Sequence, residues 1–192
     1  MAKRKIPEVL TEAEQERLVS IFNERYICSQ RNKTMIKLML DIGLRLSETI
    51  NLKWSQIDLQ TGEVKVIQGK GNKDRVVWAG EKFLKMLRRW RRRQKKEIGL
   101  VDYVFTTTNG DQLQPANVRN MVYNYAEKAG IEGKSVSPHT LRHTFATDLL
   151  RETKNIRLVQ KALGHSDIST TMVYTHIVDE ELEGALKNLR SN

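Results

Sequence analysis

Apolar residues recur at the spacing of an α-helix along most of this chain, and the residues that flank them mark where helices start and stop. Thr11 and Glu14 form the pattern of a capping box, so the first helix is expected to begin at Thr11. Residues 33–42 are apolar nearly all round, as in a buried helix, and Gly43 breaks the pattern. Further helices are expected over about 81–97, 115–129, from 138 onward, over 155–163 and from about 179.

Between residues 57 and 78 the pattern changes to short alternating stretches separated by turn residues. The segments I-D-L, V-K-V-I and V-V-W predict three short strands joined by two turns. Lys70 lies in the second turn between Gly69 and Gly71, whose small size lets the tip of the lysine approach a bound backbone closely. Taken alone, such a turn is usually a solvated hairpin tip.

The net charge of the chain indicates a polyanionic partner. The 192 residues include 33 Lys and Arg against 23 Asp and Glu, a formal net charge of +10, so nucleic acid is the leading candidate. The predicted helix over 81–97 alone carries nine of these cations. A charge run is usually a solvated face, but a run of one sign has little i,i+4 pairing to support it.

The cysteine content and the lack of long apolar runs indicate the cellular compartment of the protein. Cys28 is the single cysteine, no apolar run approaches the ~20 residues of a membrane span, and residues 1–5 lack the apolar core of a signal peptide. A hydrophobic fraction of 39% is enough to close a core. We therefore expect a folded protein of the reducing cytoplasm, associated with the nucleoid and without a membrane partner.

Two arginines stand where an anion would bind. Ser137 and Pro138 start a helix, and His139 and Arg142 then share one face of its first turns, where exposed N–H groups and the helix dipole favour a phosphate. Arg45 directly follows the buried helix and needs a partner there. Glu48 is three residues away and can orient Arg45 toward a phosphate, although a plain structural pair is the simpler interpretation.

The last candidates lie near the C-terminus. Asn155 can cap a helix that Gly164 ends, which holds His165 at a fixed turn. Ser169 can cap a short helix that carries Tyr174, a candidate nucleophile. Residues 159–177 also fit a helix-turn-helix DNA reader without chemistry, in which Tyr174 touches DNA or fills the core.

A metal site is the weakest alternative. His139 and His143 are spaced i,i+4 and could clasp zinc, but the glutamate of H-E-x-x-H and any cysteine pair are missing. We therefore expect no metal or other cofactor. His143 is interpreted instead as a histidine packed in the core.

Taken together, these residues form a recognisable set. The chain contains five motifs, G-L-R-L-S-E at Arg45, G-K-G-N-K at Lys70, H-T-L-R-H at His139 and Arg142, L-G-H at His165 and Y-T-H at Tyr174. In order and spacing they resemble the tyrosine recombinases, or phage-type integrases, from about Pro7 to the C-terminus. The resemblance implies an α+β catalytic domain, mainly α-helical with a small three-stranded antiparallel sheet, that breaks and rejoins DNA without metal or nucleotide.

The resemblance also implies a role for each motif residue. Tyr174 would be the nucleophile, Arg45 and Arg142 would hold the scissile phosphate, and Lys70 would protonate the departing 5′ oxygen. His139 would accept the proton of Tyr174, and His165 would hydrogen-bond the phosphate. As further DNA contacts we expect basic residues of the lysine turn and of the basic helix, namely Lys73, Arg75, Arg88, Arg92 and Lys95.

The expected organisation has three parts. Residues 1–10 are a lead-in, 11–178 the catalytic domain and 179–192 an amphipathic interaction helix with Leu182, Leu186 and Leu189 on one stripe. The expected partners are double-stranded DNA and further copies of the chain in a tetrameric synapse. Most members carry an additional N-terminal clamping domain, so the chain is either a trimmed catalytic domain or a naturally short member.

Overall fold

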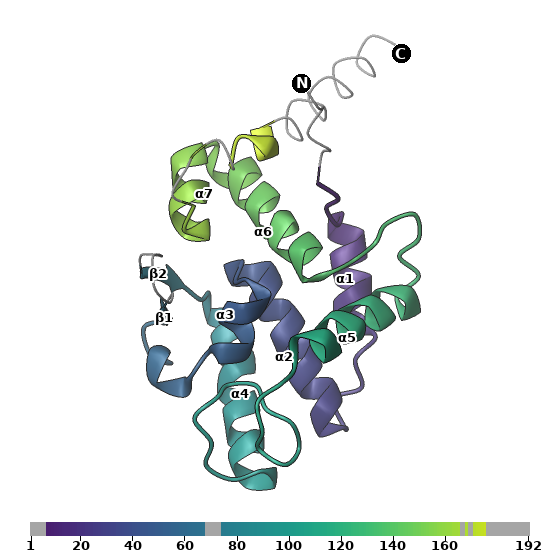
Figure 1. Ribbon diagram of the computed structural model, residues 1–192, viewed down its shortest axis with the longest axis vertical. Helices are drawn as coiled ribbons and strands as arrows, with labels where there is room; N and C mark the ends of the chain where they lie inside the picture. The colour runs from purple at the N-terminus through teal and green to yellow at the C-terminus, as the bar shows by residue number, and fades with distance from the viewer. Residues whose placement is uncertain (1–6, 68–73, 166–167, 169–170, 176–192) are drawn as a thin grey trace.

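The computed structural model describes residues 7–67, 74–165, 168 and 171–175, and all structural statements concern these residues. Most of them are helical (Figure 1). The helices are α1 (Glu12–Ser20), α2 (Ile27–Ile42), α3 (Leu46–Asn51), the 3-10 helix η1 (Trp54–Gln56), α4 (Glu81–Glu97), α5 (Pro115–Lys128), α6 (Pro138–Thr153) and α7 (Ile156–Leu163), and the strands are β1 (Glu63–Val66) and β2 (Arg75–Trp78).

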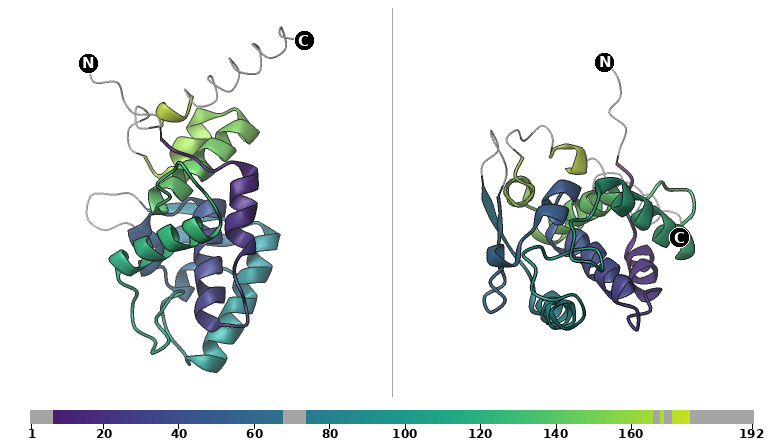
Figure 2. Two further views of the ribbon diagram at one scale, coloured as in Figure 1. Left: turned by 90° about the vertical axis from the view of Figure 1, so that its right-hand side faces the viewer. Right: turned by 60° about the horizontal axis from the view of Figure 1, so that its bottom comes forward.

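Helix α2 is the centre of the core, and both α4 and α6 pack against it. Figures 1 and 2 show α6 and α7 at one end of the molecule and the C-terminal half of α4 at the other. The helix begins at Ile27, six residues before the predicted start. Its first turns bury Ser29, Gln30 and Asn32, which hide the apolar pattern. The side chain of Gln30 is satisfied by Arg93 of α4, at 3.0 Å.

The capping residues read from the sequence are confirmed. Thr11 and Glu14 form a reciprocal capping box at α1, and Ser137 caps α6 with Pro138 in its first turn. Asn155 accepts from two backbone N–H groups at the start of α7, and Gly164 ends that helix in a left-handed conformation. These caps fix where the helices point, and α6 and α7 carry much of the site.

The sheet is smaller than the three strands expected. Strands β1 and β2 pair antiparallel, with Val66 opposite Arg75, whereas the first expected strand is reduced to one isolated bridge between Ile57 and Val64. The reason is Asp58, whose carboxylate accepts from the N–H groups of Gln60 and Thr61 and turns the chain at once. The tip of the β1–β2 hairpin, with Lys70 and Lys73, lies outside the described residues.

A second, smaller apolar cluster lies apart from the main core. Its buried residues are Ala146 and Leu150 of α6, Val159 and Leu163 of α7, and Tyr174. Tyr174 is thus held against the α6–α7 pair rather than against α2. None of the described helices is long and apolar enough to cross a membrane.

Candidate active site

The site is assembled where α2 ends and α3 begins. Gly43 ends α2 with a left-handed φ of 69°, and the chain turns so that Arg45 becomes the residue preceding α3. The backbone carbonyl of Gly43 accepts from Arg142 of α6 at 2.5 Å. A glycine turn therefore brings two arginines that are far apart in sequence to one place.

Glu48 is the acidic centre of this cluster. Its carboxylate accepts from the backbone N–H and the guanidinium of Arg45, at 2.7 and 2.8 Å, and lies 3.7 Å from the guanidinium of Arg142. Burial alone would raise the pKa of Glu48, but the hydrogen bonds from Arg75 and from the Arg45 backbone outweigh it and hold that pKa at about 2. The predicted Arg45–Glu48 pair is present, and it belongs to a larger network.

Arg75 of β2 completes the network, which does not suit the direct DNA contact expected of it. Two of its guanidinium nitrogens bind the two carboxylate oxygens of Glu48, each at 2.8 Å, and the third donates to the carbonyl of Ala162 at 2.8 Å. Its side chain is 7% exposed. Arg75 therefore fastens the β1–β2 hairpin to α3 and to the end of α7, so that it supports three motif-bearing elements at once.

Arg142 and His165 lie side by side. The guanidinium of Arg142 donates to the carbonyl of Leu163 at 2.6 Å and lies 3.4 Å from Nε2 of His165. Nδ1 of His165 lies 3.0 Å from the hydroxyl of Thr171. Burial lowers the pKa of Arg142 to about 10, and burial together with the charges of Arg142 and Arg45 lowers the pKa of His165 to about 4. Arg142 and His165 are thus partly desolvated and lie in a strongly positive surrounding.

Tyr174 belongs to the smaller cluster and lies close enough to Arg142 and Arg45 to be influenced by their charges. The residue is 2% exposed, and its hydroxyl lies 2.8 Å from Nδ1 of His143. Burial raises the pKa of Tyr174, although the charges of Arg142 and Arg45 oppose that shift. His143, interpreted from the sequence as a packed core residue, is therefore the hydrogen-bonding neighbour of Tyr174, a contact that sequence reasoning missed. Its only signal was its position directly after Arg142.

The remaining predicted residues are placed less centrally. His139 is exposed on the first turn of α6. On α4, Arg92 and Lys95 are exposed, whereas Arg88 donates to the carbonyl of Leu59 and to Glu81. No group of three or more His, Cys, Asp or Glu side chains within the described ranges is arranged to hold a metal ion.

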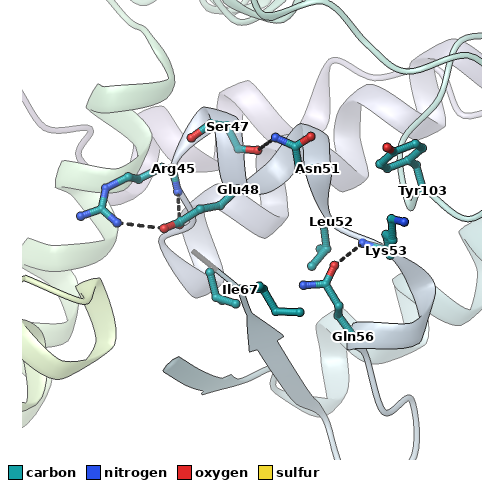
Figure 3. A pocket seen from close by; sticks show the side chains of 10 residues that line it. Arg45, Ser47, Glu48, Asn51, Leu52, Lys53, Gln56, Ile67 and Tyr103 are labelled. Atoms are coloured by element: carbon teal, nitrogen blue, oxygen red, sulfur yellow. Dashed lines mark hydrogen bonds and ion pairs between the residues drawn. The ribbon is translucent and has the colours of Figure 1, made fainter. Parts of the chain in front are cut away.

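A cleft of mixed polar and apolar lining opens next to Arg45, between α3, η1, the end of β1 and the loop between α4 and α5 (Figure 3). Its other lining residues include Ser47, Asn51, Lys53, Gln56 and Tyr103. Helix α5 packs beside α3. The exposed face of α5 carries Arg119, Asn120, Tyr123 and Asn124. Arginine and asparagine are the side chains that most often make paired hydrogen bonds to guanine and adenine.

Comparison with known proteins shows which family has this sequence and fold. The model of the phage integrase family matches residues 8–181. The chain is 40% identical to the tyrosine recombinase XerD of Ralstonia nicotianae over 181 residues, 93% of this chain and 58% of that protein. It is also 40% identical over 189 residues to a tyrosine recombinase of Thermosipho africanus, covering 97% of this chain and 63% of that one.

Solved structures of recombinases have the same fold as this chain. The XerA recombinase superposes with a TM-score of 0.82 at 34% identity, over 97% of this chain and 66% of that one. The XerH recombinase in a post-cleavage complex with its difH substrate gives 0.81 at 29% identity, over 95% and 53%. The chain belongs to the phage integrase family, and the helix-turn-helix alternative is not favoured. It spans about three fifths of the length of the curated relatives it matches.

Proposed function

We propose that this protein is a site-specific tyrosine recombinase, which cleaves and rejoins double-stranded DNA through a 3′-phosphotyrosyl intermediate in the bacterial cytoplasm, on nucleoid DNA. The observation that carries the proposal is the convergence of Arg45, Arg142 and His165 beside the buried hydroxyl of Tyr174. A phosphodiester gains negative charge on its equatorial oxygens in the transition state. Fixed guanidinium and imidazole groups stabilise that charge without a metal ion.

The proposed steps assign one role to each motif residue. Arg45 and Arg142 bind the non-bridging oxygens of the scissile phosphate, and His165 hydrogen-bonds to the same group. Tyr174 attacks phosphorus, and the 5′ oxygen leaves with a proton from Lys70, which lies outside the described residues. A phosphotyrosyl bond conserves the energy of the broken bond, so a second 5′-hydroxyl can reverse the step.

The expected result with a suicide DNA substrate, whose cleaved 5′ fragment diffuses away, is a covalent protein–DNA adduct that survives denaturant. The adduct should form equally in EDTA, because the site offers cations of its own. Tyr174→Phe should bind the same DNA and give no adduct. If adduct formation required Mg²⁺ or Zn²⁺, or if the Phe variant formed an adduct, the proposal would be wrong.

For DNA contacts we propose a division between two helices. The exposed face of α5 lies beside α3 and presents Asn120 and Asn124, which suit base edges in the major groove. Arg92 and Lys95 of α4 add contacts that depend on charge alone.

Two double variants separate these contributions. Arg92→Ala with Lys95→Ala should reduce the slope of log affinity against log salt by about 1 to 2, with sequence preference unchanged. Asn120→Ala with Asn124→Ala should leave the salt slope unchanged and weaken binding to the preferred site by about 1–3 kcal/mol per lost base contact. Binding titrations on specific and scrambled DNA measure both. An unchanged salt slope in the α4 variant would mean that Arg92 and Lys95 lie on a solvated face and do not contact DNA.

We propose further that copies of the chain assemble on DNA through residues 179–192, which lie outside the described residues. A mainly apolar groove between β2, α6 and α7 offers an acceptor, lined by Val76, Trp78, Phe145, Leu149 and Leu158. Trp78 is 63% exposed. The apolar stripe at Leu182, Leu186 and Leu189 matches such a groove in chemistry. Lys161 at its edge suits the acidic residues at 179–181.

Leu186→Asp should therefore abolish cooperative assembly on paired DNA sites while preserving binding to a single site. Trp78→Asp should do the same from the acceptor side, because it places a charge in the groove. In a mixture of the two variants, the intact C-terminal segment of the Trp78 variant can dock only in the intact groove of the Leu186 variant. The mixture should therefore form no more than this one interface. Gel-shift titrations on one-site and two-site DNA report the cooperativity, and full cooperativity in the Trp78 variant would exclude this groove.

A further inference from the structure

The nucleophile candidate and its neighbour form a pair of the kind found in enzymes that activate a weak nucleophile. The Tyr174 hydroxyl and Nδ1 of His143 are 2.8 Å apart, within the range for direct proton transfer. The rings are tilted by 51° with centroids 5.7 Å apart, so the contact is a hydrogen bond at the ring edge rather than a stack. A phenol with an ordinary pKa of about 10 needs such a base at neutral pH.

His143 and His139 are related by one helical turn, but they differ in environment. His139, the acceptor that the family resemblance suggests, is exposed on the first turn of α6. His143 is half-buried one turn further on, between the buried residues Arg142 and Thr144. The described contacts of the Tyr174 hydroxyl therefore join it to His143.

The charged groups around His143 make it responsive to bound phosphate. Burial, and then the charges of His139 and Arg142, lower the pKa of His143 to about 4, so the imidazole is neutral at pH 7. Arg45 is a further cation of the site, whereas His165, whose pKa is also lowered to about 4, is neutral at pH 7. A phosphodiester bound by Arg45 and Arg142 brings negative charge that offsets these cations and raises the basicity of His143. The base thus becomes effective when substrate is present.

We propose that His143 is a further catalytic residue, the general base that takes the proton of Tyr174 as the nucleophile attacks. This inference rests on the proposed recombinase function. The proton moves from Tyr174 Oη to His143 Nδ1 while the bond from Oη to phosphorus forms and the bond from phosphorus to the 5′ oxygen breaks. The 5′ oxygen receives a separate proton, from Lys70. In rejoining, the 5′-hydroxyl attacks phosphorus and gives its proton to the neutral amine of Lys70, while the bond from phosphorus to Oη breaks and the imidazolium returns its proton to Oη.

Single-turnover cleavage of the suicide substrate tests the proposal with two variants. His143→Gln keeps a hydrogen-bonding side chain but accepts no proton, and His143→Ala leaves space. Both should bind DNA as wild type does and cleave about 100-fold or more slowly. Added imidazole should restore part of the rate of the Ala variant and none of the Gln variant. Melting temperatures near that of wild type exclude misfolding as the cause.

The pH dependence gives a readout that a merely structural role would not move. The wild-type rate should level off above the titration of the active-site histidines. The rate of His143→Ala should continue to rise about tenfold per pH unit, because the phenol must then ionise unaided. Variants of His143 that cleave at the wild-type rate, or a Gln variant with the wild-type rate beside a slow His139→Ala, would overturn the assignment.

The two levels of the account fail in different ways. If wild-type protein forms no adduct at all, the proposed function is wrong and the His143 comparison is not reached. If wild-type protein forms the adduct and Tyr174→Phe does not, the function holds, and the rates of the His143 and His139 variants then decide which imidazole is the base.

Discussion

Replacing Glu48 with alanine is expected to lower the free energy of unfolding by about 3–5 kcal/mol, because it leaves buried guanidinium groups without their shared counter-charge. Glu48 is 6% exposed and lies within 3.7 Å of Arg45, Arg75 and Arg142. Like charges would then repel one another in a desolvated pocket. Denaturant unfolding measures the loss, and the single-turnover rate should fall in parallel because Arg45 and Arg142 lose their fixed positions.

A double-mutant cycle makes this prediction specific. Glu48→Ala, Arg75→Ala and the double variant should show a coupling energy of about 1–3 kcal/mol, since each residue is the other's two-point partner. Arg75→Lys should restore little, because a lysine offers no fork for two carboxylate oxygens. Additive losses in the cycle would mean that Arg75 and Glu48 act independently, contrary to the network described.

The second large effect is expected at Gly43. A Cβ atom at this position would lie 2.1 Å from the ring of Phe145, and the residue has a φ of +69° that a side chain adopts only with strain. Gly43→Ala should therefore cost about 2–4 kcal/mol of stability, combining backbone strain with overpacking. It should also slow cleavage, because the Gly43 carbonyl positions Arg142.

Gly130 provides the matched control. It has a similar φ of +64°, but a Cβ atom there would meet nothing within 4 Å. Gly130→Ala should cost only the backbone term, about 1 kcal/mol, and leave the cleavage rate unchanged. Equal losses from the two variants would show that the contact with Phe145 contributes nothing, and that Gly43 matters only for its backbone conformation.

Local signals in the sequence predicted much of the fold. The caps at Thr11, Ser137 and Asn155 and the helix ends at Gly43 and Gly164 depend on residues a few positions apart, so they can be read directly. The start of α2 was predicted six residues late, because its first turns bury polar residues, of which Gln30 is hydrogen-bonded by Arg93 of the distant helix α4. The first expected strand was reduced to a bridge because the Asp58 turn competes with strand pairing.

In the site, too, contacts between residues close in sequence were predicted and contacts between distant residues were not. Arg45 and Glu48 are neighbours on one helix turn, and their pairing was predicted. The role of Arg75 was not, since its partners Glu48 and Ala162 are 27 and 87 residues away and no periodicity reports them. His143 was missed for a related reason. A histidine on the buried side of a helix fits core packing equally well until Tyr174 is placed beside it.

Peptide mapping of the trapped adduct shows whether DNA is attached covalently to Tyr174. The adduct from the suicide substrate should be digested with protease and nuclease, and the modified peptide identified by mass spectrometry. We expect a nucleotide 3′-phosphate on the phenolic oxygen of Tyr174, with a free 5′-hydroxyl on the released strand. A modified residue other than Tyr174, or a 5′-phosphate on the released strand, would contradict the account.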